Sequence, residues 1–337
     1  MNPHYASVDL DELSWEDERF VVHSFVPWKR LDASLDRSGI LFPPWVWVRE
    51  DGRYTIVDGF KRLSWLRERG AVSAECAVLP ISEHFPRLML LRIEGKLMGP
   101  PLNVAEKAQI ISKLAEIAPL EEIAARWLPA LDIAPQPEAV EKWSRLAAQS
   151  VGLLEAAATG EICERAAFGL IGWEDEARGA ALALLKQLRC SASIQIEILE
   201  RVTEIAIRGG KSRMEVLSSR ELREIVDHPR WNHRRKTQSL RDLLYGLRFP
   251  RLRAREEAFA RDLAAAGLPK DVRLVPPQAF EGERWQLQVF FALPEELRAC
   301  LQQALELSHS PVLQRLMSSK LPEKKRTHSP DTPFETP

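Results

Sequence analysis

Apolar residues recur at helical spacing almost without interruption from about residue 84 to residue 210. Residues at positions i, i+3 and i+4 share one face of a helix, so each stretch predicts an amphipathic helix. Short polar joints separate the stretches, which indicates a compact all-α bundle and not a coiled coil. The predicted helices are LRIEGKLMG, NVAEKAQIISKLAEI, LEEIAARWL, PEAVEKWSRLAAQ, VGLLEAAATG, ICERAAFGLIG, EDEARGAALALLKQL and SIQIEILERVTEIAIRGG.

A different pattern precedes the helices, because short strands alternate with short helices over residues 20–82. The expected strands are VVHSFV, PPWVWV, RYTIV and ECAVLP, and the expected helices are LDASLDRSG and KRLSWLRERG. This alternation predicts a small α/β unit. The acidic segment before it, residues 1–19, is expected to be a loose leader, and its polarity excludes a secretory signal.

Within this unit, YTIVDGFKRLSWLRERG predicts a strand, a turn at Asp58-Gly59 and a helix with Lys61 and Arg62 in its first turn. A helix N-terminus beside a glycine, with two cations, is suited to hold a phosphate.

The chain carries a net charge of −1, yet residues 208–255 hold fourteen Lys or Arg against five acidic residues. This block, which includes Trp231 and Tyr245, indicates contact with a polyanion, while a solvated helical face is the open alternative. The candidate DNA contacts within it are Arg230, Arg234, Arg235 and Lys236.

The C-terminal part predicts a small α-β-β-α unit over residues 256–307, with AREEAFARDLAAAGL and PEELRACLQQALEL as helices. Such a unit would gain most by pairing with a copy of itself. The apolar residues Leu287, Val289, Phe291 and Leu293 on one face indicate a sheet buried either against its own helices or against a partner. Residues 308–337 are rich in Ser, Pro, Lys and Thr and are expected to be disordered. The four widely spaced cysteines indicate reduced thiols, and no apolar stretch approaches the roughly 18 residues of a membrane span. We therefore expect a cytoplasmic, nucleoid-associated protein without a membrane partner.

The segments LDASLDRSGILFPPWVWV and YTIVDGFKRLSWLRERGAVSAECAVLP resemble, in this order, the N-terminal domain of the ParB family. The resemblance implies a ParB/sulfiredoxin-like fold that binds CTP, accompanied by Mg²⁺. It places Gly39, Ile40 and Pro43 near the base and sugar. It places Gly59, Lys61 and Arg62 on the triphosphate. The catalytic cysteine of sulfiredoxins is missing from this region, so that chemistry is excluded.

The segment LRIEGKLMGPPLNVAEKAQIISKL resembles the third ParB motif, an acidic-Asn-x-x-Arg segment followed by Leu-Asn-Pro. Glu94 stands at the acidic position, while Gly95 and Met98 replace the Asn and Arg. Phe60 replaces a glutamate of the second motif, and Ser64 replaces its last basic residue. These departures predict nucleotide binding with weak or absent hydrolysis.

Two further motifs keep alternatives open. Asp58-Gly59-Phe60-Lys61-Arg62 satisfies the Asp-Gly-x-x-Arg pattern of kinases and nucleases of the same fold, with Asp58 and Glu94 as the candidate catalytic acids. The helices at residues 120–128 and 137–149 stand where ParB proteins carry a helix-turn-helix, with Lys142 and Arg145 as candidate DNA contacts. Glu138 and Glu141 oppose phosphate approach and the connection is long, so a purely structural helix pair is the alternative.

The sequence thus predicts an α+β multidomain protein. Its expected parts are a leader (1–19), a ParB-like N-terminal domain (20–100), an all-α helix-turn-helix-like domain (101–207), basic linker helices (208–255), a dimerisation domain (256–307) and a disordered tail (308–337). The expected function is ParB-like DNA binding in partition or transcription regulation, as a CTP-dependent clamp. The resemblance implies a homodimer and a partner ATPase. The alternatives are a ParB-fold phosphotransferase or nuclease, and a degenerate relative that binds DNA without nucleotide.

Overall fold

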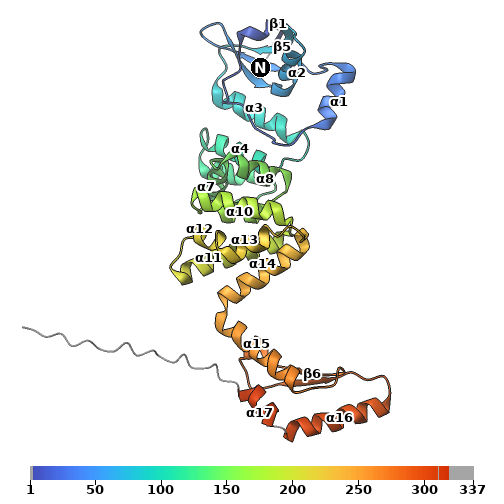
Figure 1. Cartoon of the computed structure of the whole chain (residues 1–337). Coiled ribbons are helices and arrows are strands. Elements are labelled where there is room, and N and C mark those ends of the chain that lie inside the picture. Colours follow the sequence, from blue (N-terminus) through green and yellow to red (C-terminus); the bar gives the residue numbers. More distant parts are fainter. Residues whose placement is uncertain (1–2, 310, 319–337) are drawn as a thin grey trace, which may run out of the picture.

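The computed structural model describes residues 3–309 and 311–318. Its parts follow one another in chain order, from an N-terminal sheet through a stack of helices to a small C-terminal α/β unit (Figure 1). Mixed α/β architecture is therefore confirmed, with most of the regular structure helical.

The N-terminal sheet has five strands in the order β1-β5-β3-β4-β2. The strands are β1 (His4–Asp9), β2 (Leu13–Ser14), β3 (Trp45–Val48), β4 (Tyr54–Asp58) and β5 (Ser73–Leu79), and the helices beside them are α1 (Lys29–Ser38) and α2 (Phe60–Glu68). β1 pairs antiparallel with β5 and β3 with β4, while β3–β5 and β2–β4 are parallel. Val46 of β3 and Ile56 of β4 pair with each other, and both are fully buried in one cluster with Leu63 of α2.

The expectation of a loose leader at residues 1–19 is wrong. Residues 4–9 and 13–14 form β1 and β2, an edge strand at each side of the sheet, because Val8, Leu10 and Leu13 are buried in the core below it. The many acidic residues of this segment indicated a polar leader, so its few apolar residues were not recognised as core residues. The ends of the sheet are therefore built from the chain's first residues.

The predicted strand VVHSFV is also wrong, since residues 21–26 form no strand. This segment is a strap that buries Phe20 and Val22, and side chains of helix α4 (Val104–Ala115) satisfy its backbone. Gln109 bonds both the N–H and the carbonyl of His23, each at 2.8 Å, and the Asn103 side chain donates to the Ser24 carbonyl at 2.7 Å. Side chains of α4 and its N-cap therefore take the place of a neighbouring strand for three backbone groups of this segment.

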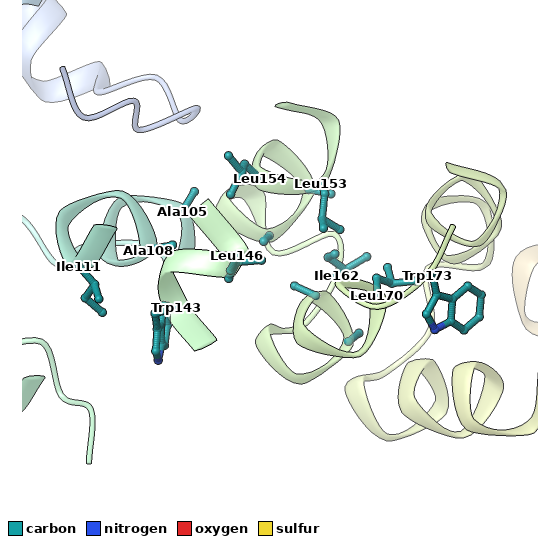
Figure 2. Packing of buried hydrophobic residues seen from close by; sticks show 14 of the residues in the cluster. Ala105, Ala108, Ile111, Trp143, Leu146, Leu153, Leu154, Ile162, Leu170 and Trp173 are labelled. Atoms are coloured by element: carbon teal, nitrogen blue, oxygen red, sulfur yellow. The ribbon is translucent and has the colours of Figure 1, made fainter. Parts of the chain in front are cut away.

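The helices from α3 to α14 share one continuous core. Their bounds are α3 (Phe85–Leu97), α4, α5 (Leu120–Glu122), a π turn (Ile123–Trp127), α6 (Leu128–Ala130), α7 (Pro137–Ala147), α8 (Val151–Thr159), α9 (Glu164–Leu170), α10 (Asp175–Leu188), α11 (Ala192–Gly209), α12 (Arg213–Leu217), α13 (Arg220–Val226) and α14 (His233–Arg248). In Figure 2, Leu146 of α7 lies near Ala108 of α4 on one side and toward Leu153 of α8 on the other. The same cluster extends to Leu170 and Trp173.

The expected boundary at residue 208 is wrong, because α12, α13 and α14 belong to the helical core. Their residues Val216, Leu217, Leu222, Leu240 and Leu244 are buried in the same cluster as α4 and α7. Most of the predicted basic linker is therefore part of the helical bundle. The chain leaves the bundle only with α15 (Pro250–Ala265).

The C-terminal unit follows the predicted α-β-β-α order. It contains α15, the antiparallel strands β6 (Val272–Val275) and β7 (Gln286–Val289), and helix α16 (Pro294–His309). Helix α17 (Pro311–Ser318) lies within the tail that was expected to be disordered, and its Leu316 is buried with Phe259, Leu274 and Phe280. Residues 319–337 lie outside the described residues. Across residues 3–309 and 311–318, no helix is both long enough and apolar enough to cross a membrane.

Candidate anion and nucleic-acid sites

Gly59 forms the turn between β4 and α2 with a φ of 95°, a left-handed conformation that side chains rarely adopt. A Cβ atom added here would lie 2.7 Å from Cβ and 3.0 Å from Cα of Pro44. Pro44 cannot easily retreat, because it is buried and its carbonyl accepts the Ala77 N–H at 2.8 Å. The fold itself therefore requires glycine at this position, whatever binds beside it.

Arg62 joins the two sequence motifs. Its Nη1 donates to the carbonyl of Phe42, and its Nη2 donates to Oδ2 of Asp58 at 2.5 Å. Gly39, where α1 ends, and the half-buried Ile40 and Pro43 lie in the same loop as Phe42. The Arg62 guanidinium group thus links residues 39–43 to residues 58–62, next to the β3–β4 pairing of Trp45 with Asp58.

Asp58 also binds a residue that the sequence pattern did not single out. Its Oδ1 lies 2.5 Å from Nη1 of Arg92, on α3, whose side chain is only 11% exposed. Burial lowers the pKa of Arg92, and the Asp58 charge opposes that shift. The Nε atom of Arg92 is buried without a hydrogen-bond acceptor. A basic residue on the apolar face of α3 was the sequence signal for this position.

Lys61 begins a second chain of contacts. It is exposed, and its Nζ lies 3.2 Å from Oγ of Ser24, whose carbonyl accepts the Asn103 amide. Asn103 and Glu106 form the predicted capping box of α4, with both hydrogen bonds present. Glu106 in turn pairs with Lys96 of α3 at 2.5 Å. Burial lowers the pKa of Lys96, the charges of Arg92 and Lys61 lower it further, and Glu106 opposes them.

These contacts define a cationic cluster at the start of α2. It consists of Lys61, Arg62, Arg92 and Lys96 with the carboxylates Asp58 and Glu106, and so carries two net positive charges. Gly59 provides no side-chain cap for α2, so the first N–H groups of the helix have no side-chain acceptor. Excess positive charge beside an uncapped helix N-terminus fits a phosphate group.

The candidate catalytic acids are not brought together by a shared partner. Both oxygens of Asp58 are engaged by arginines, whereas Glu94 is largely exposed and lies 3.9 Å from Arg126. Among residues 3–309 and 311–318, no three His, Cys, Asp or Glu side chains gather as they would around a metal ion. These described residues therefore offer no carboxylate cage for Mg²⁺.

The predicted helix-turn-helix pair corresponds to residues 120–130 and α7, joined by residues 131–136. Val140, Trp143 and Leu146 bury one face of α7. Lys142 and Arg145 are both exposed on the other face, but Glu138 and Glu141 share it. Lys142 also folds back, with its Nζ 4.1 Å from the centre of the Phe168 ring. This face of α7 is electrostatically mixed.

Acidic residues neutralise much of the basic block. Arg213, Arg220, Arg241, Arg248 and Arg253 each form an ion pair. Four of the acidic partners, Glu174, Glu197, Glu204 and Glu257, lie outside the block. A charge count within residues 208–255 therefore overstates the positive charge that is free to meet a polyanion.

The start of α14 keeps its positive charge. Arg230, Arg234 and Arg235 are exposed, and in the described part of the chain no acidic side chain lies within ion-pair distance of them. The guanidinium carbon of Arg235 lies 4.6 Å from the Trp231 ring centre. The fourth candidate, Lys236, differs, since its ammonium group binds the Val226 carbonyl at the end of α13. Three of the four predicted contacts are thus available to a ligand.

Apolar side chains are exposed on the C-terminal unit. Leu287 and Phe291 are 43% and 54% exposed, so the face that the sequence predicted to be buried is open in a single chain. Leu301 and Leu305 of α16 are exposed as well. A single chain therefore leaves large apolar side chains of this unit in contact with water.

Comparison with known proteins finds limited similarity. No family model matches the chain, and no curated protein matches it significantly by sequence. Among solved structures, the C-terminally truncated chromosome-partitioning protein ParB from Caulobacter crescentus, complexed to the centromeric parS site, is 16% identical. The match covers 58% of this chain and 99% of that one, with a TM-score of 0.33. The same truncated ParB complexed with CTP-γ-S is 20% identical, with coverages of 55% and 98% and a TM-score of 0.22. Similarity at this level does not assign the chain to a family.

Proposed function

We propose that this chain is a ParB-like DNA-binding protein whose N-terminal unit binds the triphosphate of a nucleotide, with CTP as the nucleotide. The observation that carries this proposal is the cationic cluster at the start of α2, where four basic side chains gather with only two carboxylates. Arginine forks and helix N–H groups are the protein groups best matched to phosphate oxygens. Lys61 and Arg62 contact the triphosphate, and residues 39–43 contact the base and sugar.

Nucleotide binding without rapid hydrolysis is the form of the activity that these residues favour. Hydrolysis needs a group that orients the attacking water, commonly together with a metal ion. Phe60, beside Lys61, has no polar atom on its side chain, and both oxygens of Asp58 are held by arginines. The nucleotide therefore acts as a ligand that changes the conformation of the N-terminal unit.

DNA is bound through its phosphates by Arg230, Arg234 and Arg235, with a smaller contribution from Lys142 and Arg145 on α7. Phosphate contacts of this kind give affinity and salt dependence but little sequence preference. Two copies joined through the exposed apolar face of the C-terminal unit present two sets of these cations to one duplex.

A nucleotide screen by isothermal calorimetry tests the first part. CTP, UTP, ATP and GTP are titrated, each with Mg²⁺, into the full-length protein. We expect heat from CTP and at least a tenfold loss of affinity in Arg62→Ala. Arg69→Ala is the matched control, because Arg69 follows the other end of α2 and pairs with Asp36 outside the cluster. Absence of binding, or equal affinity in Arg62→Ala and the wild type, would refute the assignment.

Salt-dependent DNA retardation tests the second part. Arg234→Gln and Arg235→Gln should each reduce the slope of log affinity against log salt by about 1. Arg220→Gln is the control, because Arg220 is also exposed to solvent but is already paired with Glu224 at 2.8 Å. Equal slopes in all three variants would show that α14 does not contact the phosphates.

A second candidate function is DNA binding that needs no nucleotide. It is favoured by the internal pairing of Asp58 with Arg62 and Arg92, which satisfies two of the four cations without a ligand. DNA retardation that is unchanged by CTP, together with no heat from any nucleotide, would select this candidate.

A further inference from the structure

Asp58 is an anion that the chain itself supplies to its cationic cluster. It is the last residue of β4 and directly precedes Gly59, where α2 begins. Its two oxygens are divided between two arginines, Oδ2 to Arg62 and Oδ1 to Arg92, each at 2.5 Å. A carboxylate shared in this way presents two negatively charged oxygens to two guanidinium groups, as a phosphate would.

The position of Arg62 depends on this carboxylate. Arg62 lies on the first turn of α2 and reaches back along its own helix to Asp58, which leaves its side chain only 16% exposed. Its other terminal nitrogen binds the Phe42 carbonyl. The adjacent Lys61 is exposed and bonds only the Ser24 hydroxyl among the described residues. Asp58 thus keeps the Arg62 side chain against the protein, and Arg62 binds the loop of residues 39–43 through the Phe42 carbonyl.

We infer that Asp58 is an internal competitor of phosphate, which a polyphosphate has to replace on Arg62 before it can bind. This inference rests on the proposed function, since it concerns the same cluster. The exchange moves Arg62 from the carboxylate to a phosphate oxygen and frees the Phe42 carbonyl. Asp58 therefore lowers the affinity for polyphosphate and couples its binding to release of residues 40–42.

A double substitution isolates this competition. Asp58→Asn alone would leave the buried Arg92 charge without its partner, which is strongly destabilising. Asp58→Asn combined with Arg92→Gln removes one negative and one positive charge, so the cluster keeps its net charge. Removing both partners of a buried pair costs much less than removing one. Any gain in affinity then comes from the freed Arg62 and not from a change in net charge.

The matched control is Asp36→Asn with Arg69→Gln. Asp36 and Arg69 form another Asp–Arg pair of the N-terminal unit, at 2.6 Å, but they are about half exposed and lie outside the cluster. This double variant changes the same residue types and also conserves net charge. It should bind polyphosphate as the wild type does.

The experiment is calorimetry with inorganic triphosphate and with CTP on the three full-length proteins. We expect at least tenfold tighter triphosphate binding by the Asp58→Asn/Arg92→Gln variant, equivalent to about 1.4 kcal/mol. Carbon-13 NMR of the wild type labelled at the phenylalanine carbonyls gives a second readout, with the Phe42 signal assigned by its loss in Phe42→Leu. Saturating triphosphate should shift the Phe42 carbonyl signal, because this carbonyl loses its bond from Arg62.

The outcomes separate this inference from the proposed function. If the wild type binds CTP and the double variant binds triphosphate no tighter, nucleotide binding stands and the competitor role of Asp58 is refuted. If only the double variant binds, the competitor role is supported and nucleotide binding by the wild type is refuted. If neither binds, both are refuted. Should the double variant not fold, an unchanged Phe42 carbonyl signal in the triphosphate-treated wild type refutes the inference, and a shifted signal supports it.

Discussion

Substitution of Gly59 by alanine tests whether the turn before α2 is required by the fold. Two costs are expected. An L-residue at a φ of 95° costs about 1–2 kcal/mol. The new Cβ would also lie 2.7 Å from the Pro44 Cβ and 3.0 Å from its Cα, and overpacking of this kind typically costs about 1–3 kcal/mol. Together the variant should lose about 2–5 kcal/mol of local stability.

Gly52→Ala separates these two costs. Gly52 lies in the turn between β3 and β4 with a φ of 81°, and an added Cβ there meets nothing within 4 Å. This control therefore carries only the conformational cost, about 1–2 kcal/mol. The difference between the two variants measures the contact with Pro44.

Hydrogen exchange of the β3 and β4 amides is the suitable assay. It reports the free energy of opening of this sheet by itself, and a chain with several folding units need not unfold in one step. Gly59→Ala should exchange measurably faster than Gly52→Ala. Equal exchange in the two variants would refute the steric argument, and the need for glycine would then come from φ alone.

Three other predictions follow from the described contacts. A hydrogen bond from the Arg19 side chain lowers the pKa of Asp17 to about 2, below its ordinary value near 4. The ionised carboxylate therefore stabilises the fold at neutral pH. This stabilisation is lost as the pH falls from about 4 to about 2. Asp17→Asn should lower the stability by about 1–2 kcal/mol at pH 7, allowing for screening by water around Arg19, and in thermal melts the gap to the wild type should close as the pH falls below 4. Leu287→Ser with Phe291→Ser should weaken self-association at least tenfold in sedimentation equilibrium, and an unchanged molar mass would contradict dimerisation through this face. Burial raises the pKa of Cys76 to about 11, so iodoacetamide at pH 8 should leave this thiol unlabelled in the native protein and label it in denaturant, as mass spectrometry would show.

Helices were predictable from the sequence because their determinants are local. Each predicted helix of the bundle is found, and the capping box of Asn103 and Glu106 forms as the spacing indicates. The β4–α2 turn at Gly59 was predictable for the same reason. Periodicity and capping act over a few residues, so they can be interpreted without knowledge of the fold.

Pairing between distant segments was not predictable. The segment that contains β1 was interpreted as a leader, because a strand's partner can lie far away in the sequence, here in β5. Residues 21–26 were interpreted as a strand because their apolar, β-branched residues are typical of one. The side chain of α4 that binds the backbone of His23 is more than 80 residues away, so the sequence pattern could not show this contact. The basic block was overestimated for a related reason, since the carboxylates of Glu197 and Glu204 reach it from α11.

The sequence by itself determined the helical bundle, the strand–glycine–helix turn and the presence of Lys61 and Arg62 at the start of α2. Only the tertiary structure decided what those cations contact. It brought Arg92 from α3 to Asp58, and it placed Arg62 between Asp58 and the loop of Phe42. Charge interactions depend on distance in space and on burial, and neither can be derived from spacing along the chain. The phosphate-binding motif that the sequence predicts is therefore, in the folded chain, a cluster that already holds a carboxylate of its own.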